Sequence, residues 1–235
     1  MRIERQFILG ILAMTLTLVA AGNVDAGNLV VNGDFENTSV TTGQKVQFSS
    51  ASVTGWTGGS NLTYIASPGT ASTVYLAVYP GLPSTSPVGG NFVEADGDPT
   101  YSSTISQSIS GLTVGQKYDV TFWQAAGQQV NFTGPTTEEW KVGLGSEYHY
   151  SHQYQLPQGA TGPWQFQYLE FTATATTEAL SFLAVGTPNG APPISFLDGV
   201  SLQAVPEPSS LALVAFGIIG LGLARSRRQA KSAAV

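Results

Sequence analysis

Two histidines that lie close together are the first residues whose spacing suggests chemistry. His149 and His152 fall within a span of four residues. A zinc site in a protein takes three or four side-chain ligands, and the chain holds two histidines in all and no cysteine. We therefore interpret the pair as surface histidines in a loop or at the edge of a strand.

Adjacent acidic residues could supply an acid for cleavage of a glycosidic bond. Glu138 and Glu139 are neighbours, but glycoside hydrolysis needs two carboxyl groups that face one bond from separate positions. No partner is identifiable, and there is no nucleophile elbow, phosphate-binding loop or defensible Ser-His-Asp order. The sequence predicts a protein that is not an enzyme.

A second acidic set recurs at every other residue. Glu94, Asp96 and Asp98 have the spacing of one strand face or of the first half of a calcium loop. The calcium loop is incomplete, because no glutamate stands at its closing position. We interpret the set as a solvated acidic turn before Pro99.

The last predicted strand carries one acidic residue on an apolar face. With strict alternation, that face consists of Ile194, Phe196, Asp198, Val200 and Leu202. A buried carboxylate without a partner is too costly to stay charged, so Asp198 must be protonated, hydrogen-bonded or bound to a cation. Alternatively, Asp198 caps a backbone amide, or Gly199 marks a bulge that turns the carboxylate outward.

Aromatic residues in or beside predicted loops indicate a ligand better than the acids do. They are Tyr64, Tyr75, Tyr79, Tyr148, Tyr150, Tyr154 and Trp164. Exposed rings stack on the apolar faces of sugars as on other flat ligands. For a glycan site we select Tyr79, Tyr148, Tyr150 and Trp164, at one end of the fold or on its concave face. Trp56 and Trp123 are assigned to the core or to a sheet face.

The elements that must position these residues are β-strands. Residues 105–109 and 118–124 alternate with period two and flank a turn at 111–116. Further strands are predicted at 28–31, 62–65, 73–78, 91–95, 140–144, 165–172, 180–185 and 194–202. About ten short strands in one domain predict an all-β, two-sheet antiparallel jelly-roll sandwich.

The N-terminal segment is predicted to be a secretory signal peptide that spans residues 1–26. Arg2 and Arg5 precede an apolar run at 7–21, and Val24-Asp25-Ala26 is a small-residue cleavage site. There is no twin arginine, so export follows the general secretion pathway. The mature chain is expected to start at Gly27, with the sandwich domain at 27–204.

The C-terminal segment has three parts. Val205-Pro206-Glu207-Pro208 precedes an apolar helix predicted at 209–224, and a basic cluster at 225–231 includes Arg225, Arg227 and Arg228. The apolar run from Leu211 to Ala224 spans about 21 Å as a helix, short for a bilayer core of about 30 Å. Transient insertion followed by cleavage fits better than a permanent anchor. The basic cluster is expected to stay cytoplasmic. The alternative, a buried core helix, is disfavoured by three glycines.

The charge of the central domain excludes one class of partner. Residues 27–205 contain three lysines, no arginine and twelve acidic residues, a net charge of −9. Nucleic-acid binding is excluded, because phosphate contacts need many basic side chains. An acidic exported domain suits divalent cations and neutral glycans. Without cysteine, it must be held together by its core, with or without a metal.

The C-terminal tail resembles the PEP-CTERM sorting signal of Gram-negative bacteria, with Val205-Pro206-Glu207-Pro208 as its motif. The resemblance implies that an exosortase recognises the motif, removes the helix and passes the protein outward, commonly in cells that produce exopolysaccharide. The expected route is therefore an inner-membrane intermediate, followed by the cell surface or extracellular matrix.

The domain itself resembles the galactose-binding-like jelly rolls, which include many carbohydrate-binding modules. The similarity rests on the segments 28–36, 55–56, 91–97, 105–123 and 196–202. It is closest to a domain family of unassigned biochemical function, found in plant cell-wall proteins and in exported bacterial proteins with the same tail.

The resemblance also implies a structural calcium ion, because such modules often carry one between the start of the domain and its last strand. Glu36 and Asp198 would be its side-chain ligands, with Asp34 or backbone carbonyls completing an oxygen shell.

Two functions remain open at this point. The first is an exported, non-enzymatic surface or matrix protein that binds glycan or exopolysaccharide. The second is a structural or adhesive sandwich that binds proteins without sugar specificity, and hydrolysis comes third. Exposed aromatic residues on a sheet face favour the first, whereas a free sheet edge and self-association favour the second.

Overall fold

Alternation with period two builds the strands of this protein, as the sequence predicts. In β5 (Ile105–Ser110) Ile105, Gln107 and Ile109 are buried, whereas the residues between them are partly or fully exposed. The computed structural model describes residues 27–206. The predicted signal peptide, Glu207, Pro208, the 209–224 helix and the basic cluster lie outside the described residues. Within 27–206, no helix is long and apolar enough to cross a membrane.

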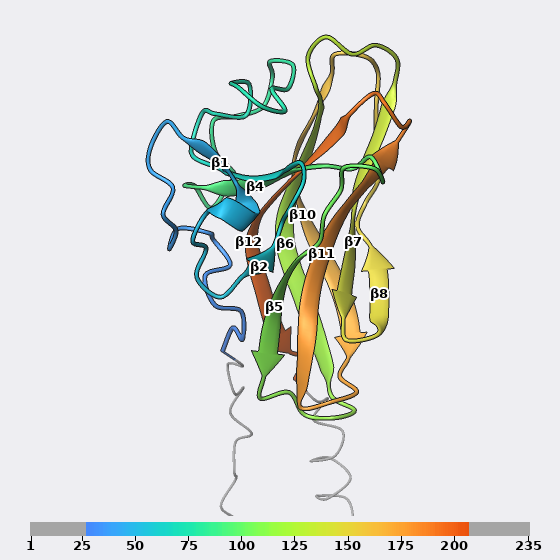
Figure 1. Ribbon diagram of the computed structural model, residues 1–235. Coiled ribbons are helices and arrows are strands. Elements are labelled where there is room, and N and C mark those ends of the chain that lie inside the picture. Colours follow the sequence, from blue (N-terminus) through green and yellow to red (C-terminus); the bar gives the residue numbers. More distant parts are fainter. Residues whose placement is uncertain (1–26, 207–235) are drawn as a thin grey trace, which may run out of the picture. The chain divides into compact units, whose positions relative to one another are not determined.

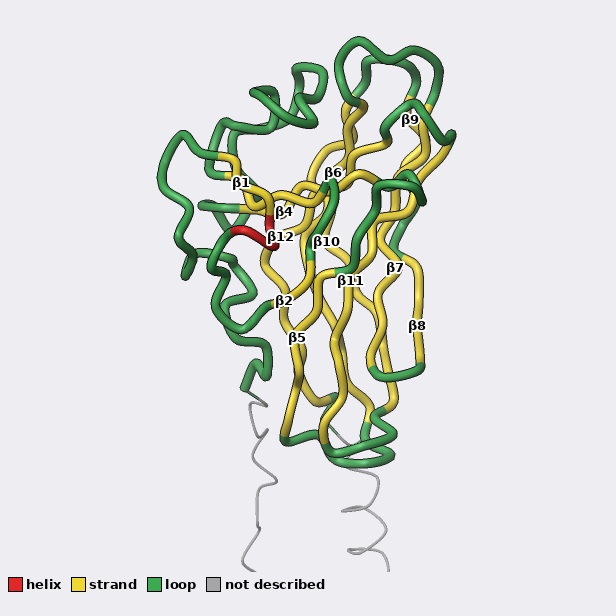
Figure 2. Tube along the Cα trace, viewed as in Figure 1, coloured by secondary structure: helices red, strands yellow, loops and turns green. Residues whose placement is uncertain are grey.

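The strands form two antiparallel sheets that pack face to face (Figure 1). Sheet I has the order β1 (Lys45–Gln47), β3 (Thr63–Ala66), β4 (Phe92–Asp96), β12 (Pro193–Ala204), β6 (Lys117–Gln128) and β10 (Thr161–Thr172). Sheet II has the order β2 (Thr57–Gly58), β5, β11 (Thr177–Thr187), β7 (Thr136–Leu144) and β8 (Glu147–Tyr150), and β9 (Tyr154–Leu156) also pairs with β7. The all-β antiparallel jelly-roll prediction is confirmed. A single short 3-10 turn, η1 (Phe48–Ser50), interrupts the strands and loops of the described part (Figure 2).

Large apolar side chains from both sheets fill the space between them. Phe122 of sheet I meets Phe182 of sheet II edge to face, with 5.3 Å between ring centroids. Trp140 of sheet II is 1% exposed, and its Nε1 donates a hydrogen bond of 3.0 Å to the carbonyl of Phe196 in β12. This bond satisfies the polar atom of a buried indole and fixes the spacing of the two sheets.

A long connection covers part of the outer face of sheet I. Residues 67–91, here named the cover segment, pack Leu76 and Val78 against Phe92 and Phe196 of the sheet. Lys45 holds the segment in place. Its Nζ donates to the carbonyls of Ala71 and Tyr75 at 3.2 and 3.1 Å.

The same lysine forms a fully buried ion pair. Lys45 Nζ lies 2.7 Å from a carboxylate oxygen of Glu94, and both side chains are 0% exposed. Our interpretation of Glu94, Asp96 and Asp98 as a solvated turn is therefore wrong, since all three are buried. Asp98 accepts hydrogen bonds from the backbone N–H groups of Thr100 and Gly190, at 2.8 and 2.7 Å. These acids serve internal contacts.

Strict alternation along the closing strand is also wrong. Between Asp198 and Ser201, β12 gains one residue relative to β6, and Gly199 has φ +61°. A bulge of this kind shifts the following side chains to the other face. Consequently Phe196 packs in the outer cluster under the cover segment, whereas Val200 and Leu202 pack between the sheets.

Two predicted strands are absent from the described residues. Segment 28–31 lies beside β12 without forming a strand. The side-chain oxygen of Asn28 accepts hydrogen bonds from the N–H groups of Val30 and Leu202, at 3.0 and 2.9 Å, so these groups are not free for strand pairing. Segment 73–78 bends at Tyr75 and Leu76, whose φ angles are +51° and +39°. Extended backbone is incompatible with those angles.

The buried ion pair provides a test of how the cover segment is held. Lys45→Met leaves the Glu94 carboxylate buried without its cation, so we expect the free energy of unfolding to fall by about 3 to 5 kcal/mol. Urea denaturation of residues 27–206 measures it. This segment holds every described strand pairing and forms one compact unit.

Lys117→Met is the matched control, because Lys117 pairs with Glu170 through side chains that are 57% and 39% exposed. Exposed pairs contribute little to stability. Equal losses in the two variants would contradict a pinning role for Lys45.

Candidate functional site

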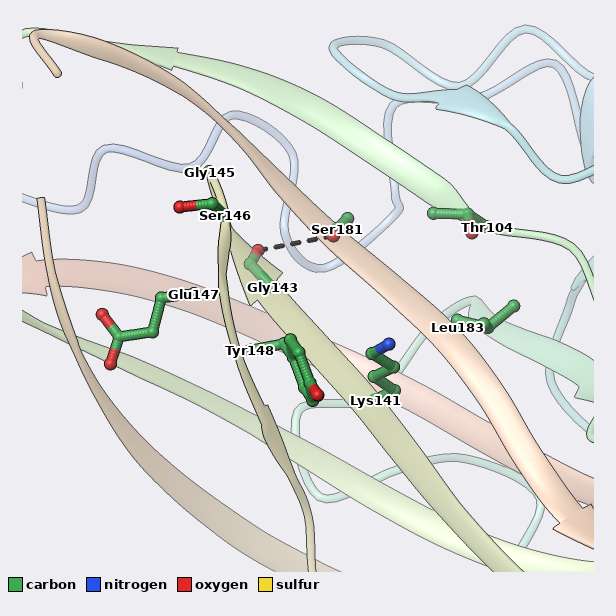
Figure 3. Close-up of a pocket in the computed structure, with 9 residues that line it drawn as sticks. All are labelled: Thr104, Lys141, Gly143, Gly145, Ser146, Glu147, Tyr148, Ser181 and Leu183. Carbon is green, nitrogen blue, oxygen red and sulfur yellow. Dashed lines mark hydrogen bonds between the residues drawn. The ribbon is translucent and has the colours of Figure 1, made fainter. Parts of the chain in front are cut away.

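The outer face of sheet II is hollowed beside β8. Cross-strand pairing places Lys141 opposite Tyr150 and Gly143 opposite Tyr148, so these four residues share one face. The hollow, here named the sheet II trough, has a volume of about 250 Å³. It is lined by Thr104, Lys141, Gly143, Gly145, Ser146, Glu147, Tyr148, Ser181 and Leu183 (Figure 3).

One tyrosine, Tyr148, lines the trough, and a second, Tyr150, follows it on the same face of β8. Tyr148 and Tyr150 are 54% and 48% exposed, and their rings meet edge to face with centroids 6.0 Å apart. Lys141 Nζ lies 4.0 Å from the centroid of the Tyr148 ring. This cation–π contact holds the ring in place, and the lysine is itself one of the lining residues.

Small residues keep the floor of the trough low. A Cβ atom on Gly143 would come within 2.8 Å of Ser181 Oγ, so a larger residue there would fill the hollow. The Ser181 hydroxyl donates to the Gly143 carbonyl at 3.5 Å (Figure 3). The result is a polar floor beside an aromatic wall.

The carboxylate in the lining is held as an anion. Glu147 accepts the backbone N–H of Thr172 at 2.9 Å and contacts His149 Nε2 at 2.9 Å. These bonds, the first of them foremost, hold the pKa of Glu147 below its usual value. Glu147 is therefore a poor proton donor. The trough offers stacking and hydrogen-bonding groups.

The four residues selected from sequence do not come together. Tyr148 and Tyr150 share the sheet II face, but Trp164 packs on Phe92 and Phe196 on the other sheet, with centroids 6.0 and 6.3 Å away. Tyr79 lies beside the end of β6, where its N–H donates to Gln128 and its hydroxyl to the Phe132 carbonyl. A single site with all four residues is therefore wrong.

Sequence reasoning missed the aromatic residues on the outer face of sheet I. Phe166 and Tyr168 of β10 are 55% and 56% exposed, and Phe166 meets Trp123 of β6 at 5.4 Å between centroids. Assigning Trp123 to a sheet face was right, and Trp56 is buried in the core. The missed signal was the alternation of aromatic residues at 164, 166 and 168.

The three acids selected as metal ligands lie near one another. Asp198 is 0% exposed, whereas Asp34 and Glu36 are exposed. Burial raises the pKa of Asp198 to about 8; the hydrogen bonds from Ser86 and Gly199 lower it, and repulsion from Glu36 and Asp34 raises it further. The Val200 N–H donates to the Gly33 carbonyl at 2.8 Å, so the segment that carries Asp34 and Glu36 lies beside the part of β12 that follows Asp198.

Protein donors satisfy the same carboxylates. The Ser86 hydroxyl donates to Asp198 Oδ2, and the Gly199 N–H donates to Oδ1 at 2.6 Å. Glu36 accepts the N–H of Asn91 at 2.5 Å. The carboxylate oxygens of Asp198, Glu36 and Asp34 are ligands of the kind that calcium takes. Within 27–206, however, no three acidic or histidine side chains converge as a metal group. The donor chemistry fits calcium, and the arrangement is not a closed shell.

The other acid and histidine candidates lie apart. Glu138 points into the sandwich and is 0% exposed, and burial raises its pKa to about 8. Glu139 accepts a hydrogen bond from Gln153 on the opposite face of β7. His149 packs on Phe171, with centroids 4.9 Å apart, and His152 is exposed.

Comparison with known proteins identifies the tail. Residues 204–228 match the family described as the PEP-CTERM protein-sorting motif. The chain therefore carries this motif, as its sequence indicates. No curated protein matches the chain.

Solved structures resemble the chain distantly. The enzymatically active domain of tailspike protein 4 from bacteriophage CBA120 has a TM-score of 0.39 and 14% identity, over 76% of this chain and 21% of that one. TmCBM61 in complex with β-1,4-galactotriose has a TM-score of 0.39 and 16% identity, over 77% and 100%. The CBM22-1 xylan-binding domain from Paenibacillus barcinonensis Xyn10C has a TM-score of 0.38 and 10% identity, over 78% and 98%. The chain thus spans about a fifth of the phage domain, and similarities of this size leave its ligand open.

Proposed function

We propose that this protein is an exported, non-enzymatic surface or matrix protein that binds a neutral glycan through the sheet II trough. The observation that carries the proposal is the pair of exposed tyrosines, Tyr148 and Tyr150, beside a hollow of about 250 Å³ with a floor of glycine and serine. Ring faces stack on the C–H faces of sugars. The hydroxyls of Thr104, Ser146 and Ser181 supply donors and acceptors for sugar hydroxyls.

The negative charge of the domain favours neutral polymers over anionic ones as its ligand. Residues 27–205 have a net charge of −9, and of their three lysines Lys45 is buried and Lys117 is paired with Glu170. Lys141 is the lysine in the trough, and it lies over a tyrosine ring. A polyanion would be repelled by this domain. Neutral polysaccharide in the extracellular matrix fits the surface best.

The alternative, a sandwich that binds proteins by strand addition, is disfavoured at the edge of β10. Free strand edges invite pairing with another chain. Here the Glu147 carboxylate accepts a hydrogen bond from the Thr172 N–H at 2.9 Å, and the Gln167 side chain accepts one from the His152 N–H at 2.9 Å. The segment 147–152 therefore covers part of this edge.

Removing the tyrosines tests the trough. For Tyr148→Ala/Tyr150→Ala we expect the retention of residues 27–206 on insoluble neutral polysaccharides (xylan, mannan, galactan, cellulose) to fall by about tenfold, or about 1.4 kcal/mol. Tyr75→Ala is the matched control, because Tyr75 is 65% exposed on the cover segment. Unchanged retention of the double variant on every polymer that the wild type binds would refute the trough as the site.

For the tail, we propose recognition and cleavage by an exosortase after export through the general secretion pathway. The motif match at 204–228 supports this proposal. The hydrogen bonds of the domain reach Val205, whose N–H donates to the Lys117 carbonyl at 2.9 Å. Pro206 is exposed immediately after it.

Mass spectrometry of the protein from fractionated cells tests the cleavage. We expect a product in the surface or matrix fraction that lacks residues 209–224. Pro206→Ala/Pro208→Ala is expected to keep the full-length chain in the inner membrane. An intact C-terminus in the outer fraction would contradict cleavage.

We also propose that calcium binds Asp198, Glu36 and Asp34. A divalent cation would replace the mutual repulsion of the three carboxylates with attraction and would favour the charged form of Asp198. Without metal, the folded pKa of about 8 lies above the usual 3.8, so stability present in acid is lost as the pH rises from about 4 to about 8. Calcium would remove this loss.

Chelation is the test. At pH 8, calcium at a hundredfold excess over its dissociation constant is expected to stabilise residues 27–206 by about 2.7 kcal/mol relative to EDTA, measured as a rise in melting temperature. Glu36→Gln keeps an acceptor for Asn91 and should lose the rise, whereas Glu170→Gln should keep it. A melting temperature that EDTA leaves unmoved would disprove calcium binding.

A further inference from the structure

The outer face of sheet I is open where the cover segment ends. The strands β12, β6 and β10 lie side by side there, with Asp198 opposite Trp123 and Trp123 opposite Phe166. Thr121 is likewise paired with Ser201 and with Tyr168. Paired residues share a face, so Trp123, Phe166 and Tyr168 form one surface, here named the sheet I platform.

The platform is an exposed aromatic surface that is bordered on one side by the cover segment. Phe166 and Tyr168 are more than half exposed, at 55% and 56%. Val88, at the end of the cover segment, is 53% exposed. A Cβ atom on Gly199 would lie 3.2 Å from both Trp123 and Val88, so the glycine lets these two side chains flank the bulge. The cover segment therefore borders the rings without burying them.

Polar groups on the same face are of the kind that binds sugar hydroxyls. The Tyr168 hydroxyl donates to Asp119 Oδ1 at 2.5 Å, and this bond raises the pKa of Tyr168 to about 12. The phenol therefore stays protonated while the carboxylate keeps free acceptor positions. Thr121 and Ser201 add hydroxyls next to the rings. Rings flanked by neutral hydroxyls and carboxylate acceptors match a neutral saccharide and repel an anionic one.

We infer that the sheet I platform is a second neutral-glycan site, independent of the trough, and that the protein holds two polysaccharide chains at once. The trough lies on the outer face of sheet II and the platform on the outer face of sheet I, with the main core between them. One chain cannot occupy both without passing around the sandwich. Bivalency rests on the proposed function of the trough, whereas binding at the platform does not.

The test compares residues 27–206 as wild type, as Tyr148→Ala/Tyr150→Ala, as Phe166→Ala/Tyr168→Ala and as the combined variant. Retention on insoluble xylan, mannan, galactan and cellulose measures binding. Capture of a fluorescent soluble form of the retained polymer on the same particles measures bridging. Tyr75→Ala is the exposed aromatic control, and urea denaturation verifies that each variant folds.

We expect the trough variant to keep weak retention, which the added platform substitutions reduce by a further tenfold or so. We expect each double variant alone to lose at least about tenfold in bridging, because one remaining site cannot join two chains. Bridging by Phe166→Ala/Tyr168→Ala at the wild-type level would overturn the inference. The inference would also be overturned if the trough variant retained no polymer at all. It would be overturned likewise if the residual retention of the trough variant did not change when the platform substitutions were added.

The outcomes separate the two proposals. If the platform variant loses retention and the trough variant keeps it, the trough is refuted as a site and the platform stands as a glycan site. If only the trough variant loses retention, the platform is refuted and the trough stands. A folded wild type that retains none of the polymers would overturn both.

Discussion

The closing strand β12 lies between β4 and β6 in sheet I. The bulge after Asp198 determines on which side of the sheet the apolar side chains of each half pack. Before the bulge, Ile194 and Phe196 pack outward under the cover segment. After it, Val200 and Leu202 pack inward between the sheets. One strand therefore belongs to both apolar clusters. A regular strand would have kept Asp198 on the outer face with Phe196 and would have turned Val200 and Leu202 out of the main core.

Burial of carboxylates costs this domain stability. Glu94 has a lysine partner at 2.7 Å. Asp198 and Glu138 have none. Burial raises the pKa of all three carboxyl groups to about 8, that of Glu94 in spite of Lys45. Because these values lie above those of the unfolded chain, the three groups make the fold less stable as the pH rises toward 8. A domain with three lysines and no cysteine has few means of offsetting that cost.

Much of the fold was predictable, because long alternating segments determine their own burial. Residues 105–109 and 118–124 became β5 and β6 as expected. The short strands β1, β2, β8 and β9 have too few residues to show a period. Segment 28–31 has the composition of a strand, but the Asn28 side chain takes backbone donors that a strand would have paired. The bulge depends on a positive φ at Gly199, and the presence of a glycine does not by itself predict that angle.

The candidate site was predictable in part. The exposure of Tyr148 and Tyr150 follows from alternation with His149, whereas the burial of Trp164 depends on the distant cover segment. Phe166 and Tyr168 were missed because a sequence does not tell an edge strand from a central one. The ion pair of Lys45 and Glu94 was missed for a related reason. Their meeting depends on β1 reaching β4 through β3, a neighbourhood that exists only in the folded sheet.

The position of β12 also has a mechanical consequence. The tail leaves the domain directly from this strand, and the strand is hydrogen-bonded to β4 over four residue pairs and to β6 over ten. While the tail is attached, a pull on it with the rest of the domain held would load these bonds in shear. In shear they resist together, whereas in peeling they would open one at a time. The domain is thus joined to its tail through a strand that is paired on both sides.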